Sequence, residues 1–224
     1  TQNQMQDMGL RASVEPSADL KIQLDVKKNS MTSYQEIYRI DSTGLAYGSI
    51  GQSRLGSYKT SILTINTAFK NNSSINSTVF QQFEENIGLI QDRFTRITGN
   101  SYETQSQDVL IPAFLAAYTG KSAEDVNLSP FPKIPIPNWR LDYTGLGKLE
   151  GLKEIFQSIT INHAYNSSYS VVNYSNSLEY SEVSINNPVE DYNNGMFASV
   201  TNANGELIPV YVISQVMISE QFAP

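Results

Sequence analysis

The chain has 224 residues, a net charge of −7, only 17% charged residues and no cysteine. The absence of cysteine excludes disulfides and thiolate metal sites, and no Lys/Arg cluster provides the footprint that nucleic-acid binding needs. No apolar run reaches the roughly 18–20 residues of a membrane-spanning helix, so a membrane role would have to use β-strands. The chain starts without Met and ends directly after an apolar run, and we expect it to be a fragment of a longer protein.

The first predicted element is a β-hairpin around a polar turn at residues 15–19. Apolar and polar residues alternate along both strands, which predicts one apolar and one charged face. The apolar set on the second strand is Leu20, Ile22, Leu24 and Val26, and the polar set is Lys21, Gln23, Asp25 and Lys27. This strand is expected to reach about Tyr38. Residues 41–57 are rich in Gly and Ser and predict a loop, and residues 58–69 predict a further strand.

The pattern changes at about residue 76, where apolar residues recur at helical spacing as far as Ile97. Gly99 is predicted to end this helix. Asp108 is expected to cap a second, very apolar helix, which Gly120 ends. Two roles are open for the second helix: a plug or partner-docking element, or a helix packed against the strands.

The proline-rich residues 130–137 cannot form a helix or a central strand, and they predict a stiff connector. The connector leads into an alternating strand at 139–144, which holds the only Trp, Trp139. Anchoring at an interface or packing is the favoured role for this side chain, with cargo contact as the alternative. Residues 146–157 have the spacing of a short amphipathic helix.

Two more strands are predicted in the last third of the chain. The first begins at Ile159 and carries Ile161, His163 and Tyr165 on one face, with Asn162 and Asn166 on the other. Residues 181–205 are polar and predict a loop. The final strand covers 208–218, with Val210 and Val212 on one face. The chain is therefore predicted to be mainly β, with a helical stretch at about 76–126 inside a helical and proline-rich insertion at 76–137.

No residue pattern predicts catalysis, a cofactor or a metal. His163 is the only His, and a lone His supplies no ligand set, so a structural role is favoured. No Gly-x-Ser-x-Gly elbow or phosphate-binding loop occurs. We therefore expect a protein that is not an enzyme.

Five stretches of the chain, taken in order, point to a known family. They are Gln6–Ala12, Ser106–Tyr118, Pro130–Tyr143, Ile161–Tyr165 and Ser219–Pro224. In these stretches the chain resembles the SprA/Sov family, the outer-membrane translocon of the type IX secretion system in Bacteroidota. The most distinctive positions of the resemblance are Pro135, Pro137, Asn138, Trp139, His163 and Tyr165.

The resemblance implies one segment of the C-terminal part of a very large, antiparallel transmembrane β-barrel in the bacterial outer membrane. It implies export of folded cargo proteins, including gliding adhesins in motile relatives, with gating by a PorV-like barrel protein and a periplasmic plug. The expected lumen-facing residues are Lys21, Gln23, Asp25, Asn162 and Asn166. The expected lipid-facing residues are Leu20, Ile22, Leu24, Ile159, Ile161, Val210 and Val212.

The predicted strand directions raise one question. The strands at 58–69 and 139–144 both run inward, and two inbound strands need an outbound crossing between them. Either the helical stretch and the proline connector cross inside the lumen, or one of the two orientations is reversed. The alternative function is a soluble or surface-anchored β-rich binding module, for example a glycan-binding one. Such a module would bury the expected lipid-facing residues in a closed sandwich core.

Overall fold

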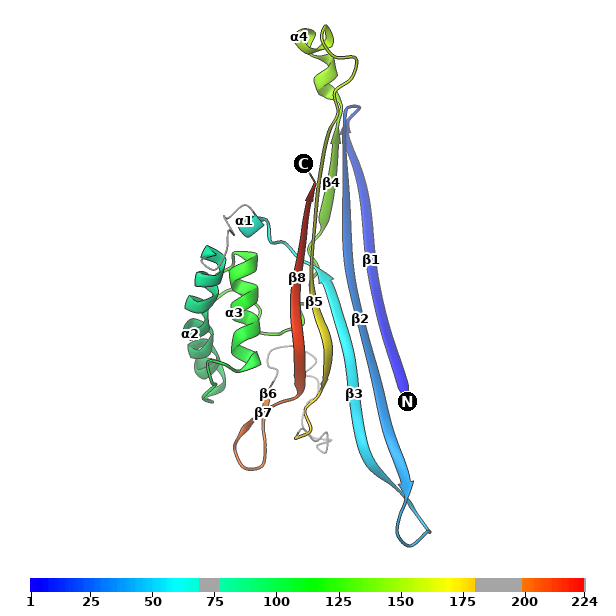
Figure 1. Ribbon diagram of the computed structural model, residues 1–224, viewed down its shortest axis with the longest axis vertical. Coiled ribbons are helices and arrows are strands. Elements are labelled where there is room, and N and C mark those ends of the chain that lie inside the picture. The colour runs from blue at the N-terminus through cyan, green and yellow to red at the C-terminus, as the bar shows by residue number, and fades with distance from the viewer. Residues whose placement is uncertain (69–76, 180–198, 224) are drawn as a thin grey trace.

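The computed structural model describes residues 1–68, 77–179 and 199–223. The chain is mainly β, with antiparallel pairing throughout its main sheet. The strands of that sheet are β1 (Gln2–Ser17), β2 (Leu20–Ile40), β3 (Tyr47–Ser61), β4 (Asn138–Tyr143), β5 (Ile161–Asn176) and β8 (Tyr211–Ala223). The other elements are α1 (Ile65–Ala68), α2 (Thr78–Thr98), α3 (Gln107–Thr119), a 3-10 helix (Gly145–Lys148), α4 (Glu150–Lys153), β6 (Ser199–Thr201) and β7 (Leu207–Pro209). Figure 1 shows a long, narrow sheet with α2 and α3 packed beside it.

β3 and β4 together fill a single strand position of the sheet. β3 pairs with residues 28–40 of β2, and β4 pairs with residues 20–25 of the same strand. On the other side, β5 pairs with both segments in the same way. The sheet is therefore an up-and-down meander, β1, β2, β3 with β4, β5, β8, in which each position is antiparallel to the next. β3 and β4 run in the same direction because they are two parts of one position, so the predicted outbound crossing is wrong.

The predicted hairpin is confirmed, and its second strand is longer than expected. Val14 lies opposite Ile22 and Arg11 lies opposite Asp25, so the apolar residues of both strands share one face. β2 continues to Ile40, because β3 provides a pairing partner along its whole second half.

The predicted loop at 41–57 is wrong beyond its first six residues. Only residues 41–46 turn, closed by the Asp41 N–H, which donates to the Ala46 carbonyl at 2.8 Å. β3 forms despite its glycines because β2 pairs with it along its length and β5 pairs with its second half, from Leu55 to Ser61, so tertiary pairing overrides a weak intrinsic propensity. The predicted strand at 58–69 ends at Ser61, where the chain leaves the sheet and forms α1, and Phe69 lies outside the described residues.

The two predicted helices are confirmed with one change. α2 starts after Ser77 and ends at Gly99, whose φ of 73° is the left-handed conformation that glycine adopts without strain. α3 ends in the same way at Gly120. The predicted N-cap of α3 is wrong: Ser106 holds that position, and Asp108 lies buried in the first turn.

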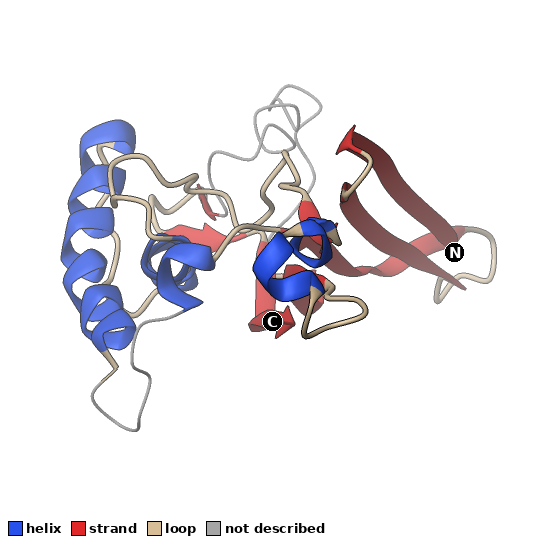
Figure 2. Ribbon diagram, turned by 90° about the horizontal axis from the view of Figure 1, so that it is seen from above, coloured by secondary structure: helices blue, strands red, loops and turns tan. Residues whose placement is uncertain are grey.

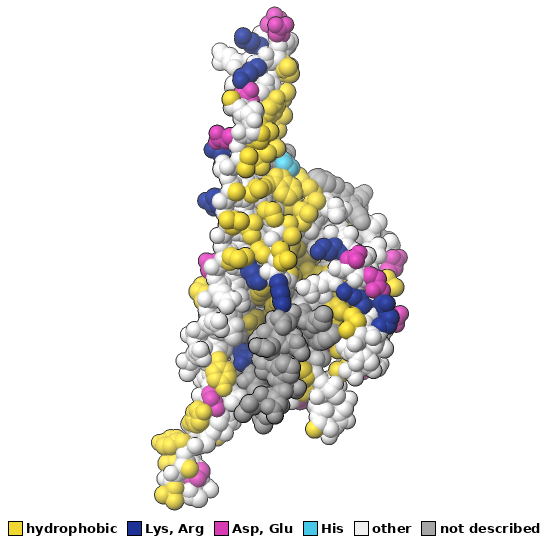
Figure 3. Space-filling model, turned by 180° about the vertical axis from the view of Figure 1, so that it is seen from behind, with side chains coloured by type: hydrophobic (Ala, Val, Ile, Leu, Met, Phe, Trp, Pro, Cys, Tyr) yellow, Lys and Arg dark blue, Asp and Glu magenta, His cyan; other side chains and the backbone are white. Residues whose placement is uncertain are grey.

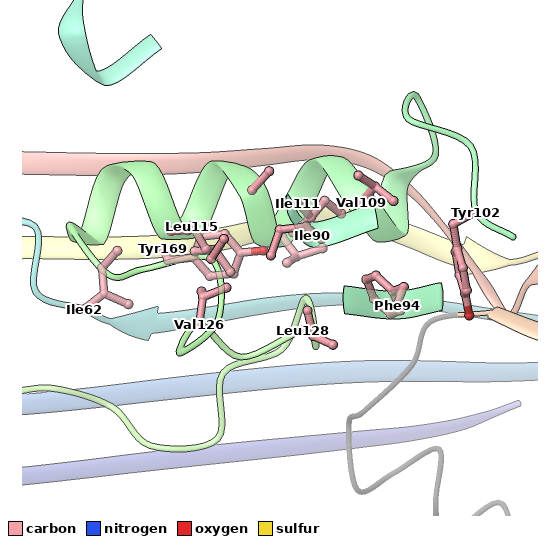
Figure 4. Close-up of a cluster of buried hydrophobic side chains, with 14 of the residues drawn as sticks. Ile62, Ile90, Phe94, Tyr102, Val109, Ile111, Leu115, Val126, Leu128 and Tyr169 are labelled. Carbon is pink, nitrogen blue, oxygen red and sulfur yellow. The ribbon is translucent and has the colours of Figure 1, made fainter. Parts of the chain in front are cut away.

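The helices bury their apolar sides against the middle of the sheet, and this contact forms the core (Figure 4). Ile90 and Phe94 of α2 and Val109 of α3 are fully buried there, as is Tyr169 of β5. Fully burying one such aliphatic or aromatic side chain contributes roughly 1.5–3 kcal/mol, so this contact holds the helical insertion on the sheet. We call residues 62–137 the helical insertion from here on.

Two predicted elements near the chain's end are broken in the structure. Residues 146–157 form a 3-10 turn and one short turn of α-helix, since Gly147 and Gly151 weaken a helix at this place. The predicted final strand is split at Val210 into β7 and β8. β6 and β7 form a small two-stranded sheet of their own, near the lower end of β8 in Figure 1. Figure 2, the view from above, shows the longest helix on the far side of the molecule from the N-terminus. Residues 180–198, most of the predicted polar loop, lie outside the described residues.

Candidate functional site

One face of the sheet is continuously apolar near the β1–β2 turn, and we call this surface the apolar band. Cross-strand register aligns its members: Leu24 lies opposite Trp139, and Trp139 lies opposite Tyr165. Its residues are Leu10, Ala12, Val14, Leu20, Ile22, Leu24, Val26, Trp139, Leu141, Tyr143, Ile161, His163, Tyr165 and Phe222. Of these, Tyr165 is only 1% exposed, so it packs beneath its neighbours and offers no surface of its own. Figure 3 shows hydrophobic side chains gathered over this part of the sheet, next to the single histidine.

Aromatic rings form the centre of the apolar band. Trp139 stacks on Tyr165 with ring centroids 4.4 Å apart and an interplanar angle of 25°. His163 lies 5.0 Å from the Phe222 ring and 6.5 Å from Trp139. The structure thus brings together three distinctive positions of the family resemblance, Trp139, His163 and Tyr165, because the β4–β5 register sets residues 138–143 beside residues 161–165. His163 sits among rings rather than among metal-ligating groups.

The opposite face of the same strands is polar and carries charges of both signs. Asp25 lies 3.4 Å from Arg11 and 3.2 Å from Lys27, and Arg140 lies 3.3 Å from Asp142. All five expected lumen-facing residues share this face, which we call the polar face. They are Lys21, Gln23, Asp25, Asn162 and Asn166. Exposed pairs of this kind contribute little to stability, and they leave the surface well hydrated.

The seven expected lipid-facing residues divide into two groups. Leu20, Ile22, Leu24 and Ile161 lie in the apolar band, and Ile159 precedes β5 by two residues. Val210 is only 1% exposed, so it offers no surface to lipid. Val212 pairs with Ser175 of β5, which pairs with β3, which pairs in turn with β2. Followed across these strands, Val212 lies on the same side of the sheet as the polar face. Val210 lies between β7 and β8, outside either strand. For Val212 the alternation is broken by an irregularity in β5 at Asn173, whose φ is 52°, where the register against β3 shifts between Gly56 and Tyr58.

The point where β3 ends and β4 begins is closed by side chains, and we call it the strand junction. The Ile136 N–H donates to the Ser61 carbonyl at 3.0 Å, and the Lys27 N–H donates to Ser61 Oγ at 3.2 Å. Asn138 Oδ1 accepts from the Ser167 N–H at 2.8 Å. Ser61 and Asn138 therefore satisfy backbone donors of β2 and β5 that a continuous strand would otherwise pair.

A buried hydroxyl network lies directly beside the junction, where the chain leaves the sheet. Tyr165 Oη accepts from the Thr64 N–H at 2.7 Å. The Thr64 hydroxyl donates to Glu220 Oε1 at 2.6 Å and lies 3.0 Å from Ser167 Oγ. Sequence reasoning missed this network, because Thr64 and Glu220 are separated by 156 residues and meet only through the sheet.

The sheet is open at both sides. Within the residues that the structure describes, β1 pairs only with β2 and β8 pairs only with β5. These edges are 16 and 13 residues long, and Met5 and Leu10 on β1 are 68% and 65% exposed. Long unpaired edges are templates for pairing with further strands.

Residues 1–68, 77–179 and 199–223 contain no group of three or more His, Cys, Asp or Glu side chains that could hold a metal. In those ranges no helix combines the length and the apolar character that crossing a membrane requires. Comparison of the chain with protein-family models and with curated proteins finds no match.

Proposed function

We propose that the chain forms part of the wall of a very large antiparallel β-barrel in the bacterial outer membrane, and that this barrel is the protein-conducting channel of the type IX secretion system. The observation that carries the proposal is the open meander with one apolar face, one polar face and two long unpaired edges. The resemblance to the SprA/Sov family supplies the identity of the channel.

The physics of a bilayer favours this arrangement. Every backbone polar group in the hydrocarbon region must be paired within the protein, and strands achieve this when both edges meet neighbours. From Leu20 to Val26 the apolar band extends about 20 Å along β2, at about 3.4 Å per residue. The apolar belt of such barrels is about 25 Å tall. Exposed Leu149 and Phe156 extend the apolar surface past the end of the strands.

The helical insertion belongs outside the lumen in this arrangement. Its helices pack on Tyr169 and Val171, and these residues lie on the same side of β5 as Ile161, His163 and Tyr165 of the apolar band. If the apolar band faces lipid, α2 and α3 rest against the outer surface of the wall, beyond the edge of the bilayer. This position replaces the expected passage through the lumen.

The polar face then lines the channel. Its mixture of carboxylates, amides and cations holds water and presents no broad apolar surface to which an exported protein could adhere. The channel does no bond chemistry: it provides a wide aqueous path. Following the family resemblance, a PorV-like barrel protein and a periplasmic plug control that path.

Paired cysteine substitutions on β2 test the membrane placement. The sequence holds no cysteine, so a nitroxide label at Ile22→Cys or Gln23→Cys marks one position only. In membranes, we expect the label at 22 to be relaxed mainly by oxygen, which partitions into lipid, and the label at 23 mainly by a water-soluble nickel chelate. Leu24→Cys and Asp25→Cys should repeat the alternation. Equal access of nickel to all four positions would instead support a water-soluble binding module.

Conduction needs a separate test in secreting cells. A photo-reactive amino acid placed at Gln23 should crosslink to exported proteins in transit, and the same group at Ile22 should crosslink to lipid only. The two positions are adjacent, so the pair controls for expression and assembly. Alternation in the labelling experiment combined with no crosslink from Gln23 would retain the membrane wall and reject the channel.

A further inference from the structure

A cavity of about 540 Å³ lies where α3 begins, between the loop at 101–106 and the strands β7 and β8. Four buried side-chain polar atoms in the described part of the chain have no hydrogen-bond partner. Three of them belong to residues that line this cavity: Tyr102 Oη, Ser106 Oγ and Asp108 Oδ1. Tyr102 and Asp108 are each only 4% exposed. Unpaired buried polar atoms are costly, so such a concentration calls for a binding partner.

The titratable carboxyls of the described cavity lining are Asp108 and Glu103. The second oxygen of Asp108, Oδ2, accepts a hydrogen bond from the Ser199 hydroxyl. Burial raises the pKa of Asp108, and burial together with the nearby Asp108 charge raises the pKa of Tyr102. Glu103 lies at the exposed side, and the described lining contains no Lys or Arg. The α3 dipole offsets part of the Asp108 charge, but no side chain of the lining neutralises the rest.

The three unpaired atoms that line the cavity are all oxygens, one from a carboxylate and two from hydroxyls, and this restricts the chemical class of the ligand. Gln107 provides the only side-chain amide of the described lining, and both of its ends are engaged: Nε2 donates to the Tyr211 carbonyl and Oε1 accepts from the Ile213 N–H. An anion would meet carboxylates. A neutral sugar could bond to the hydroxyls of Tyr102 and Ser106, which donate as well as accept, but it would leave the buried Asp108 carboxylate without a counter-charge. Hard cations such as Ca²⁺ take carboxylate and other neutral oxygens together with water.

We propose that this cavity binds a hard divalent cation of the Ca²⁺ class, with Asp108 as the anionic ligand and the hydroxyls of Tyr102 and Ser106 beside it. Ser106 is free for this role because, although it is the N-cap of α3, its side chain makes no capping hydrogen bond. The volume leaves room for several waters to complete the coordination. A site with one buried carboxylate belongs to the weak class, with a Kd on the order of 10⁻⁴–10⁻³ M. The proposal does not depend on the channel.

Terbium luminescence tests the site directly, since Tb³⁺ takes Ca²⁺ sites and is sensitised by a tyrosine close to it. The purified full chain in detergent micelles should give saturable, tyrosine-excited Tb³⁺ emission that Ca²⁺ displaces. Asp108→Asn should weaken this binding by at least about tenfold. Asp92→Asn, an exposed carboxylate on α2, is the matched control and should leave the binding unchanged.

Two further measurements separate ligation from folding. Tyr102→Phe should lose most of the sensitised emission but retain a Ca²⁺-induced rise in melting temperature, because the nearest sensitiser is removed while Asp108 remains. In chelator, Asp108→Asn should melt no lower than the wild type, because it removes a buried charge. Absence of saturable Tb³⁺ emission, or equal affinity in Asp108→Asn and wild type, would show a cavity filled by water alone and overturn the proposal.

Discussion

Asn138 Oδ1 accepts a hydrogen bond from the Ser167 N–H at 2.8 Å. At the strand junction, this side chain thus replaces the backbone carbonyl that a continuous neighbouring strand would present to Ser167. Its Nδ2 donates to Asn166 Oδ1, also at 2.8 Å. Asn138 is 8% exposed, and both bonds hold the first residue of β4 against β5. A single amide thus connects the end of the proline run to the neighbouring strand.

Replacing Asn138 by Ala should therefore destabilise the sheet. The Ser167 N–H would be left buried without a partner, which costs about 1–3 kcal/mol. Asn166→Ala removes only the bond between the two side chains, and the Ser167 N–H stays paired, so its cost should be smaller. Urea unfolding in detergent micelles, followed by circular dichroism, measures both. Equal stability of Asn138→Ala and wild type would contradict the proposed role of this amide.

Tyr165→Phe should lower stability through the hydroxyl alone. The ring and its stacking on Trp139 are retained, but the buried Thr64 N–H loses its acceptor. We expect a loss of about 1–3 kcal/mol in the free energy of unfolding. Tyr47→Phe is the control, because Tyr47 is 73% exposed, and it should change stability by less than about 0.5 kcal/mol. A similar effect of both substitutions would argue against the hydroxyl network.

Gly56 and Gly51 on β3 should respond to alanine in opposite ways. A Cβ at Gly56 would lie 2.2 Å from the Tyr174 ring and 2.7 Å from the Met31 carbonyl, and the backbone atom cannot give way. Overpacking of this kind costs about 1–3 kcal/mol or more. A Cβ at Gly51 meets nothing within 4 Å, so Gly51→Ala should be neutral or stabilise by up to about 1 kcal/mol. Thermal melting of the two variants distinguishes these outcomes.

Stability in metal-free buffer should depend on Asp108 in a defined direction. Burial raises the pKa of this carboxyl in the folded state above its ordinary value of 3.8. The folded state then holds the proton more tightly than the unfolded state does. The contribution is fully present below pH 3.8 and is lost as the pH rises through the raised value. Unfolding of wild type and Asp108→Asn across this range, in chelator, should show the variant with the flatter profile. Parallel profiles would mean that Asp108 is not perturbed.

The parts of the fold that follow from local pattern were predictable from the sequence. The alternation from Leu20 to Lys27 fixed both faces of β2, and the spacing up to Ile97 with Gly99 fixed α2. β3 was not predictable locally, because its Gly- and Ser-rich first half becomes a strand only through pairing with the distant part of β2. The strand position that β3 and β4 share was not predictable either, because nothing in residues 58–69 or 139–144 indicates that the two segments are collinear.

In the candidate site, too, the features set by local pattern were predictable and those set by contacts between distant residues were not. The polar face and the main part of the apolar band follow from period-two alternation, which needs no knowledge of distant residues. The hydroxyl network beside the strand junction joins Thr64 to Glu220, and the cavity joins Asp108 to Ser199, across 156 and 91 residues. Such pairs exist only after the sheet has set the register, so sequence spacing carries no signal for them.

The adjacency of Ser61 and Ile136 at the strand junction has a consequence for how this protein can vary. The chain leaves the sheet after Ser61 and returns beside it, with the Ile136 N–H 3.0 Å from the Ser61 carbonyl. About seventy residues are therefore inserted within one strand position without altering the number or direction of the strands. A change in the length of the helical insertion at this point therefore leaves the number and the direction of the strands in the sheet unchanged.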